Sequence, residues 1–373
     1  MPNLLQTIGD FLKAGLEKLL TGWGLPVEWS RLVAEMFAWA VGCAWGIIAI
    51  MLAALVFIYL ERKVAGYIQS RLGPTRCGPI GLLQSFADAL KLLLKEDIIP
   101  AEADRLLHFL GPVVFFIAGT LAYLVIPWDE GRNTAAIMDT NIGVLFVTAV
   151  GSLTLLGIVM GGWGSNNKWS LLGAVRGAAQ MVSYEVPMLL ALLCIVMQAQ
   201  TLSLSGIVAN QHGGLFSWNI AHPWLWLPMI LFVISGIAEV NRIPFDIPEA
   251  ESELVSGYHT EYSGMKFALF FLGEYGNTFL VAIMFSVLFM GGWQSPFGNP
   301  DPLIIAGIPL LRIPGILWLL GKALLFVIFM MWVRWTLPRL RVDQLMGMAW
   351  KLLIPAGFIS LAVTAAVIMM GWA

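Results

Sequence analysis

Long apolar runs alternate along the chain with short polar connections. Runs of 18 or more apolar residues have the length that an α-helix needs to cross a bilayer of about 30 Å. Residues 41–60, VGCAWGIIAIMLAALVFIYL, are apolar on every face, whereas a membrane β-strand would alternate apolar and polar positions. We therefore predict an all-α membrane protein, an eight-transmembrane-helix bundle with amphipathic interfacial helices. Its spans are expected at 32–60, 106–127, 141–162, 176–198, 223–240, 266–291, 313–337 and 345–371.

The first 29 residues have a different pattern. Leucine, isoleucine and phenylalanine recur at helical spacing over residues 3–20, with charged residues mostly on the opposite face. This pattern predicts an interfacial amphipathic helix lying on the membrane rather than a cleavable signal. The segment TGWGLP at 21–26 would end that helix before the membrane domain, predicted at 30–373.

Basic residues predict the orientation of the bundle. Fifteen of the 21 lysines and arginines lie on the side of the connections at about 61–105, 163–175, 239–265 and 338–344. The positive-inside rule makes this side cytoplasmic. An even number of spans then puts both termini on the opposite, outer side of the membrane.

Composition supports a membrane protein and excludes several functions. The chain of 373 residues is 59% hydrophobic and 12% charged, about half the charged share of roughly 25% in soluble domains. Its net charge of −2 and lack of a basic patch give no reason to expect nucleic acid. Three cysteines and four histidines are scattered, so the sequence encodes neither a disulfide framework nor a metal or iron–sulfur site. Any electrons must come from a partner or a diffusible carrier.

The first cytoplasmic connection combines a rigid turn with an amphipathic helix. Proline and glycine at 73, 74, 78 and 79 make the turn, and leucines from 82 to 94 with Phe86 form an apolar stripe. Asp88 and Lys91 share one face of that helix. One interpretation is an interface helix with a solvated ion pair. The other is the rim of a pocket that opens into the bilayer, with Arg62 and Arg71 lining its entrance.

The third cytoplasmic connection concentrates acidic residues. Pro244 and Pro248 prevent a regular helix at its start, and interleaved apolar residues require part of it to be buried. Crowded buried carboxylates cannot all ionise, so their pKa values should spread upward and allow proton transfer near neutral pH. A solvated acidic loop is the alternative. The acids are Glu239, Asp246, Glu249, Glu251, Glu253 and Glu261, against a single Arg242.

Two further acids, Glu185 and Glu274, lie within predicted spans. Ionisable residues at such positions are costly and usually face the bundle interior or a water-filled path. A glutamate with a satisfied hydrogen bond near a helix end is the simpler alternative.

Gly157 and Gly161 match the small-xxx-small pattern of helix packing, and we interpret them as a helix contact only.

Several stretches resemble, in order, the membrane subunits that carry the quinone site of respiratory complex I. This family includes the H subunit of bacterial NADH:quinone oxidoreductase and mitochondrial NADH dehydrogenase subunit 1. The stretches are ERKVAGYIQSRLGP, GLLQSFADALKLLLKED, SNNKWSLLGAVRGAAQMVSYEVP, NRIPFDIPEAESELVSGYHTEYSGMKFALFFLGEY and LPRLRVDQLM. The resemblance covers roughly residues 30–371 and leaves the N-terminal segment outside.

The resemblance implies a translocase subunit that couples quinone reduction to proton pumping through an eight-helix bundle bearing the mouth of a quinone chamber. It implies ubiquinone or menaquinone as substrate, with FMN and iron–sulfur clusters on partner subunits of the hydrophilic arm. Neighbouring membrane-arm subunits are further partners.

The resemblance also assigns roles to residues of this chain. The quinone-chamber candidates are Arg62, Gln69, Arg71, Phe86, Asp88, Lys91 and Phe271. The proton-path candidates are Glu185, Glu239, Asp246, Glu249, Glu251, Glu253, Glu261 and Glu274, with Arg242, Arg334 and Arg339 as charge partners.

Three alternatives stay open from sequence. The membrane anchor of an energy-converting hydrogenase would use a similar bundle without quinone. An ion-coupled secondary transporter would require inverted repeats, and the second half of the chain does not echo the first. A passive scaffold would not need Glu185 and Glu274 within its spans.

Overall fold

The structure is a computed structural model that describes residues 14–15, 17–21, 26–128, 140–249, 251–297, 304–305, 308–309 and 314–371. Most of the interfacial helix predicted over residues 1–29 falls outside this described part. Nearly all of the predicted membrane domain falls within it.

Helices make up almost all regular structure in the described residues, so the predicted all-α class is confirmed. A short antiparallel pair, β1 (Ile304–Ile305) and β2 (Ile308–Pro309), is the exception. The α-helices are α2 (Val27–Ile68), α3 (Gln84–Leu94), α4 (Arg105–Ala122), α5 (Gly143–Gly164), α6 (Lys168–Ala199), α7 (Leu204–Ala209), α8 (Trp226–Glu239), α9 (Glu251–Leu254), α10 (Gly264–Phe289), α11 (Gly315–Thr336), α12 (Val342–Met348) and α13 (Ile354–Met369). A π-helical turn, Ala349–Leu353, joins the last two.

Within the described residues, six helices are long and apolar enough to cross a membrane. They are α4, α5, α6, α10, α11 and the continuous α12–α13 unit, Val342–Met369. The apolar helix Pro223–Glu239 is shorter, and the first predicted span lies within the 42-residue α2. The chain is therefore a multi-pass membrane protein, and the count of eight spans stays a prediction.

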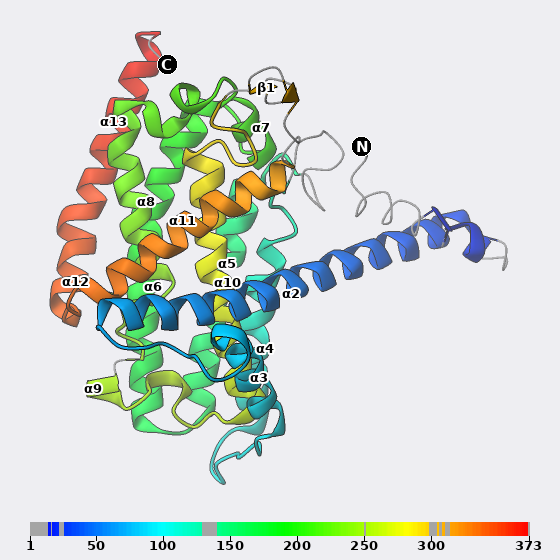
Figure 1. The fold of residues 1–373 in the computed structure, drawn as a ribbon, viewed down its shortest axis with the longest axis vertical. Helices are drawn as coiled ribbons and strands as arrows, with labels where there is room; N and C mark the ends of the chain where they lie inside the picture. The colour runs from blue at the N-terminus through cyan, green and yellow to red at the C-terminus, as the bar shows by residue number, and fades with distance from the viewer. Residues whose placement is uncertain are drawn as a thin grey trace.

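Helix α10 forms the centre of the bundle. It packs against α2, α4, α8 and α11, and most of its residues from Gly273 to Phe289 are buried. In Figure 1, α4, α5, α6, α8, α10 and α13 run along the long axis, whereas α2 and α11 cross them obliquely. A side chain on the inner face of α10 can therefore meet residues of both oblique helices.

Close helix packing depends on glycine at the contact of α4 with α5. A Cβ atom on Gly157 would lie 2.6 Å from the backbone nitrogen of Phe115, and one on Gly111 would lie 2.9 Å from Gly161. Real Cβ atoms do not approach other atoms so closely, so the two helix backbones can touch only because these residues lack side chains. The helix contact predicted from Gly157 and Gly161 is confirmed.

Two helices extend past the span ends predicted from hydropathy. Helix α2 continues to Ile68, so the segment 61–68, expected at the start of a connection, is helical. The chain has no proline between Pro26 and Pro74, and charged residues are compatible with a helix that leaves the membrane. Helix α6 begins at Lys168, inside the connection predicted at 163–175, where the Asn167 side chain accepts a hydrogen bond from the Trp169 backbone N–H.

Candidate functional site: a charged cavity between α2, α10 and α11

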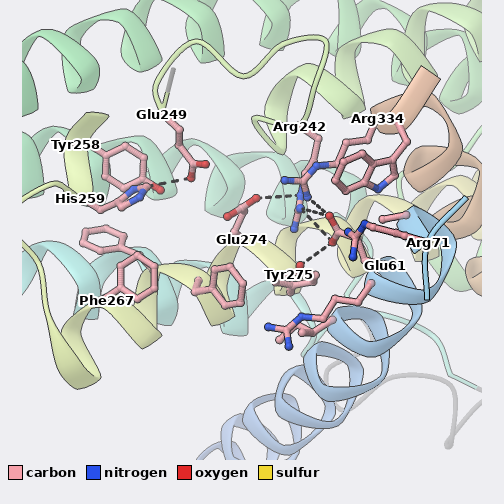
Figure 2. Close-up of a pocket in the computed structure, with 16 residues that line it drawn as sticks. Glu61, Arg71, Arg242, Glu249, Tyr258, His259, Phe267, Glu274, Tyr275 and Arg334 are labelled. Atoms are coloured by element: carbon pink, nitrogen blue, oxygen red, sulfur yellow. Dashed lines mark hydrogen bonds and ion pairs between the residues drawn. The ribbon is translucent and has the colours of Figure 1, made fainter. Parts of the chain in front are cut away.

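A cavity of about 330 Å³ lies where α2, α10 and α11 meet the α8–α10 connection, residues 240–263. Helix α10 contributes three phenylalanines together with Glu274 and Tyr275, and α11 contributes Arg334 and Trp335. Figure 2 shows ionisable side chains following one another, from His259 and Glu249 through Glu274 and Arg242 to Glu61 and Arg334. The cavity therefore joins an aromatic wall to a row of ionisable groups.

Arg242 is the centre of that row. Its Nε lies 2.9 Å from Glu274 Oε1, and its Nη1 lies 3.4 Å from Glu61 Oε2. The side chains of Arg242, Glu61 and Glu274 are only 8%, 9% and 11% exposed. Burial alone would lower the pKa of Arg242, but the carboxylates of Glu274 and Glu61 outweigh it and hold that pKa well above its usual range. The guanidinium stays charged, as a bridge between two acids.

Tyr275 and Arg334 complete the surroundings of Glu61. The Tyr275 hydroxyl donates a hydrogen bond of 2.6 Å to Glu61 Oε2, and Arg334 pairs with Glu61 Oε1. The Arg242 guanidinium also lies over the Tyr275 ring, 4.4 Å from its centroid. Glu61 thus has donors from α10, α11 and the α8–α10 connection.

The backbone around Arg242 is held by a glutamine of α6. Gln180 Nε2 donates to the carbonyl oxygens of Ala238 and Phe245, both at 2.7 Å, and approaches Asn241 Oδ1 at 3.1 Å. Asn241 itself adopts a left-handed conformation with φ +56°, which asparagine tolerates better than most residues. Because the connection is irregular, this side chain replaces hydrogen bonds that a helix would supply.

Two acids have raised pKa values: Glu249, which lines the other end of the cavity, and Asp246, which is close to Glu249 but outside the lining. Burial, followed by the charge of Glu274, raises the pKa of Asp246 to about 6 and holds that of Glu249 well above its usual range. Burial also lowers the pKa of His259 to about 4. His259 Nδ1 lies 3.8 Å from Glu249 Oε1, so burial disfavours the charged form of both partners in this contact. Proton gain or loss near neutral pH is within reach of Asp246.

Glu185 and Glu239 form a second acidic site, outside the cavity lining. The Ser152 hydroxyl of α5 donates to Glu185 Oε1 of α6. Glu239, the last residue of α8, approaches the same part of α5, because a Cβ on Gly151 would lie 3.1 Å from its Oε1. Two carboxylates from different helices thus approach one short segment of α5.

The remaining predicted acids lie elsewhere. Glu253 Oε2 pairs with Arg176 at 2.6 Å, and Arg339 lies 3.6 Å from Glu253 Oε1. The hydrogen bond from Arg176 lowers the pKa of Glu253, against a small opposing effect of burial. Glu261 Oε1 accepts a hydrogen bond of 2.6 Å from Asn167. The Glu251 side chain lies outside the described residues.

The candidates for a quinone site separate into two groups. Arg62, Arg71 and Phe271 line the cavity. Two others contact this lining, because Asp88 pairs with Arg62 at 2.7 Å and Gln69 Oε1 accepts a 2.6 Å hydrogen bond from Arg71. Phe86 and Lys91 are exposed on α3 and are not part of the lining.

Several residues of the cavity lining are not predicted from sequence, among them Glu61 and His259. Glu61 follows the apolar run directly and was interpreted as the start of a connection. If the helix is assumed to continue through Phe57, Glu61 and Ala65, which lie four residues apart, all three fall on one inward face. All three are buried, and Glu61 and Ala65 line the cavity. His259 carries no comparable signal, because its neighbour Glu249 is ten residues away along the chain.

The chemistry available to the described residues is that of proton and charge transfer. They contain no group of three or more histidine, cysteine, aspartate or glutamate side chains that could hold a metal ion. The cavity offers cations near its Arg62 and Arg71 side, carboxyl groups with several protonation states, and aromatic rings against which a flat apolar molecule can pack.

Fold and site thus define a multi-helix membrane protein with an open cavity lined by arginines, carboxylates and aromatic rings. Residues 42–365 match the NADH dehydrogenase family. The H subunit of NADH-quinone oxidoreductase from Chlorobaculum tepidum is 48% identical over 323 residues, 86% of this chain and 89% of the relative. The protein of the same name from Chlorobaculum parvum is 46% identical, covering 92% and 94% of the two chains.

A third relative, NADH-quinone oxidoreductase subunit 8 of Rhodothermus marinus, is 44% identical over 342 residues, 89% of this chain and 95% of the relative. The chain belongs to the NADH dehydrogenase family. The resemblance to the membrane subunits of respiratory complex I is confirmed, and so is the expectation that the chain is a subunit of an enzyme.

Proposed function

We propose that the cavity forms the entrance of a quinone chamber in a proton-translocating NADH:quinone oxidoreductase. Its size and mixed lining suit a ring with two carbonyl groups, since phenylalanines can pack on the ring while Arg62 or Arg71 donates to a carbonyl oxygen. The names of the relatives, which include quinone, support this substrate class.

In this proposal the acids beside the cavity begin the proton path. Quinone reduction changes the charge near Glu249 and Glu274, and each carboxyl group responds because its neighbours are charged and close. Asp246, with a pKa of about 6, exchanges a proton at little cost near neutral pH. Arg242 links Glu274 to Glu61, and Glu239 with Glu185 continues the route along α5. The energetic coupling between neighbouring carboxyl groups transmits the signal.

The chain is expected to act inside a larger assembly. The hydrophilic-arm subunits would carry FMN and the iron–sulfur clusters and would complete the quinone site. Further membrane-arm subunits would continue the proton path. We place the protein in a bacterial inner membrane with both termini on the periplasmic side.

The single observation that carries this proposal is the buried row Glu274, Arg242 and Glu61 opening directly onto an aromatic cavity. Its test uses the assembled enzyme with Glu274→Gln and Phe271→Ala. Phe271→Ala should raise the KM for quinone, because the ring forms part of the cavity wall. Glu274→Gln should lower coupled quinone reduction, because an amide cannot take up the charge changes of a carboxylate.

The controls separate these effects from general damage. Glu102→Gln removes an exposed acid outside the cavity and should behave as the parent enzyme. NADH oxidation with ferricyanide, which does not need the quinone site, should be retained in all variants. Full coupled turnover with an unchanged quinone KM in both cavity variants would refute the proposed function.

A further inference from the structure

The residue that precedes α10 does not cap its own helix. Ser263 occupies the N-cap position, where a serine side chain ordinarily accepts a hydrogen bond from a backbone N–H of the first turn. Here its hydroxyl accepts from the backbone N–H of Ile98 at 2.9 Å and donates to the carbonyl oxygen of Glu96 at 3.0 Å. Both partners lie in the segment directly after α3, more than 160 residues away along the chain. Ser263 therefore joins two cytoplasmic connections.

The next residues strengthen the same contact. A Cβ on Gly264, which adopts φ +56°, would lie 3.0 Å from the Lys95 carbonyl oxygen, so glycine allows the two backbones to approach. Lys266 Nζ pairs with Asp97 Oδ2 at 2.9 Å, with the lysine side chain 12% exposed and the aspartate 47%. Three of the four residues from Ser263 to Lys266 thus hold the segment 95–98.

Lys266 also contacts a buried aromatic pair. Its Nζ lies 3.5 Å from Nδ1 of His108, and His108 stacks on Tyr262 with ring centroids 4.1 Å apart. The Tyr262 hydroxyl in turn donates to the carbonyl oxygen of Gly161. The lysine is consequently fixed from its inner side by α4 and α5, and its ammonium group can hold Asp97 in a defined position.

The segment held in this way directly follows α3, the helix that connects two walls of the cavity. Helix α3 contacts both α2 and α10, and each of those helices contributes to the lining. At the α2 side, Asp88 of α3 pairs with Arg62. At the α10 side, residues 95–98 follow the end of α3 and are bound by Ser263 and Lys266. Helix α3 is therefore fixed at two places: Asp88 in its middle binds α2, and the segment after its C-terminal end binds α10.

We propose that Ser263 and Lys266 are positioning residues for quinone binding, which act by fixing α3 against α10 and so setting the separation of the two cavity walls. This inference rests on the proposed function. Neither residue lines the cavity, so neither touches the substrate in this proposal. Phe267, which does line it, follows Lys266 directly, and the contact with Asp97 therefore fixes the first turn of the aromatic wall.

A positioning role and a proton-path role predict different kinetics. A residue that only sets the shape of an entrance changes how well the substrate is held before reaction, and its loss raises KM with little change in kcat. A residue of the proton path would instead lower kcat. The fully assembled enzyme with Lys266→Met, Ser263→Ala or Asp97→Asn, assayed with a decyl-tailed quinone, distinguishes these outcomes.

We expect Lys266→Met and Asp97→Asn each to raise the quinone KM by about threefold or more, with kcat within about twofold of the parent. The double variant should be no worse than the more severe single one, because both changes remove the same ion pair. Ser263→Ala should raise KM as well, and peptides covering 95–98 should exchange amide hydrogen faster, since the Ile98 N–H loses its acceptor.

Lys351→Met is the matched control, because Lys351 is an exposed lysine in the π-helical turn and lies away from the cavity lining. The inference fails if the KM values of the three single variants equal that of this control. It also fails if the KM effects of Lys266→Met and Asp97→Asn add up, or if neither Lys266→Met nor Ser263→Ala yields assembled enzyme.

Phe271→Ala, assayed in parallel, separates the positioning role from the proposed quinone cavity. A raised KM there with unchanged KM at Lys266 rejects only the positioning role, and an unchanged KM at Phe271 rejects the quinone cavity itself.

Discussion

Replacing Asp246 by asparagine should stabilise the α8–α10 connection in a pH-dependent way. Burial and the nearby Glu274 raise the pKa of Asp246 from 3.8 to about 6. An acid with a higher pKa in the folded state favours folding most when it is protonated. That contribution is fully present below about pH 4 and is lost as the pH rises through about 6.

The magnitude follows from the pKa change. Each pKa unit corresponds to about 1.4 kcal/mol, so ionised Asp246 costs the folded connection about 3 kcal/mol above about pH 7 and roughly half of that at pH 5. Asparagine has nearly the same shape and no charge. Asp246→Asn should therefore gain about 3 kcal/mol of local opening free energy at about pH 8, and about half of that at about pH 5.

Hydrogen exchange of peptides covering 242–249 measures this opening free energy in the intact enzyme. Glu253→Gln is a control in which the change in opening free energy should have the opposite sign. Since the Arg176 hydrogen bond lowers the pKa of Glu253, its ionised form stabilises the fold, and the glutamine variant should open more easily at neutral pH. That loss should fade as the pH falls through the lowered pKa. An equal change of the Asp246→Asn variant at both pH values would show a packing effect and refute the electrostatic argument.

Three other predictions concern individual contacts. Lys322→Met should lower the thermal midpoint, because the lysine ammonium donates to three backbone carbonyl groups, and leaving them unpaired costs about 3 kcal/mol or more. Gly157→Ala should reduce the yield of assembled enzyme through its clash with α4, whereas Gly321→Ala, with no atom within 4 Å of the new methyl group, should be tolerated. Tyr275→Phe should keep the fold but lower quinone reduction, measured against ferricyanide reduction, since Glu61 loses a hydrogen-bond donor; unchanged turnover would exclude Glu61 from the path.

Apolar runs predicted most of the fold, because lipid demands long helices whose backbone groups are all paired. The central parts of the spans agree with α4, α5, α6, α10, α11 and α12–α13. Span ends were less predictable, since hydropathy reports contact with lipid rather than helical conformation. Helix α2 shows the difference, because its last turns carry charged residues yet remain helical.

The site was predictable as a collection of residue types, but not as a geometry. Composition identifies the acidic connection. Its acids, however, have different surroundings: Glu249 faces the cavity, Glu253 pairs with Arg176, and Glu239 approaches α5. These surroundings depend on contacts between residues that are far apart in sequence. The hydrogen bonds of Ser263 to residues 96–98 are of the same kind, because a serine before a helix normally predicts a cap.

The hydrogen bonds of Gln180 have a consequence for how this protein can respond to charge. One amide group of α6 holds both ends of the segment 238–245, so the dipoles around Arg242 are oriented before any substrate arrives. In water, a new charge is stabilised only after solvent molecules have turned toward it, and that reorganisation contributes to the barrier. A preoriented set of dipoles needs little rearrangement. The folding of this connection thus lowers in advance the reorganisation energy of each later change in charge.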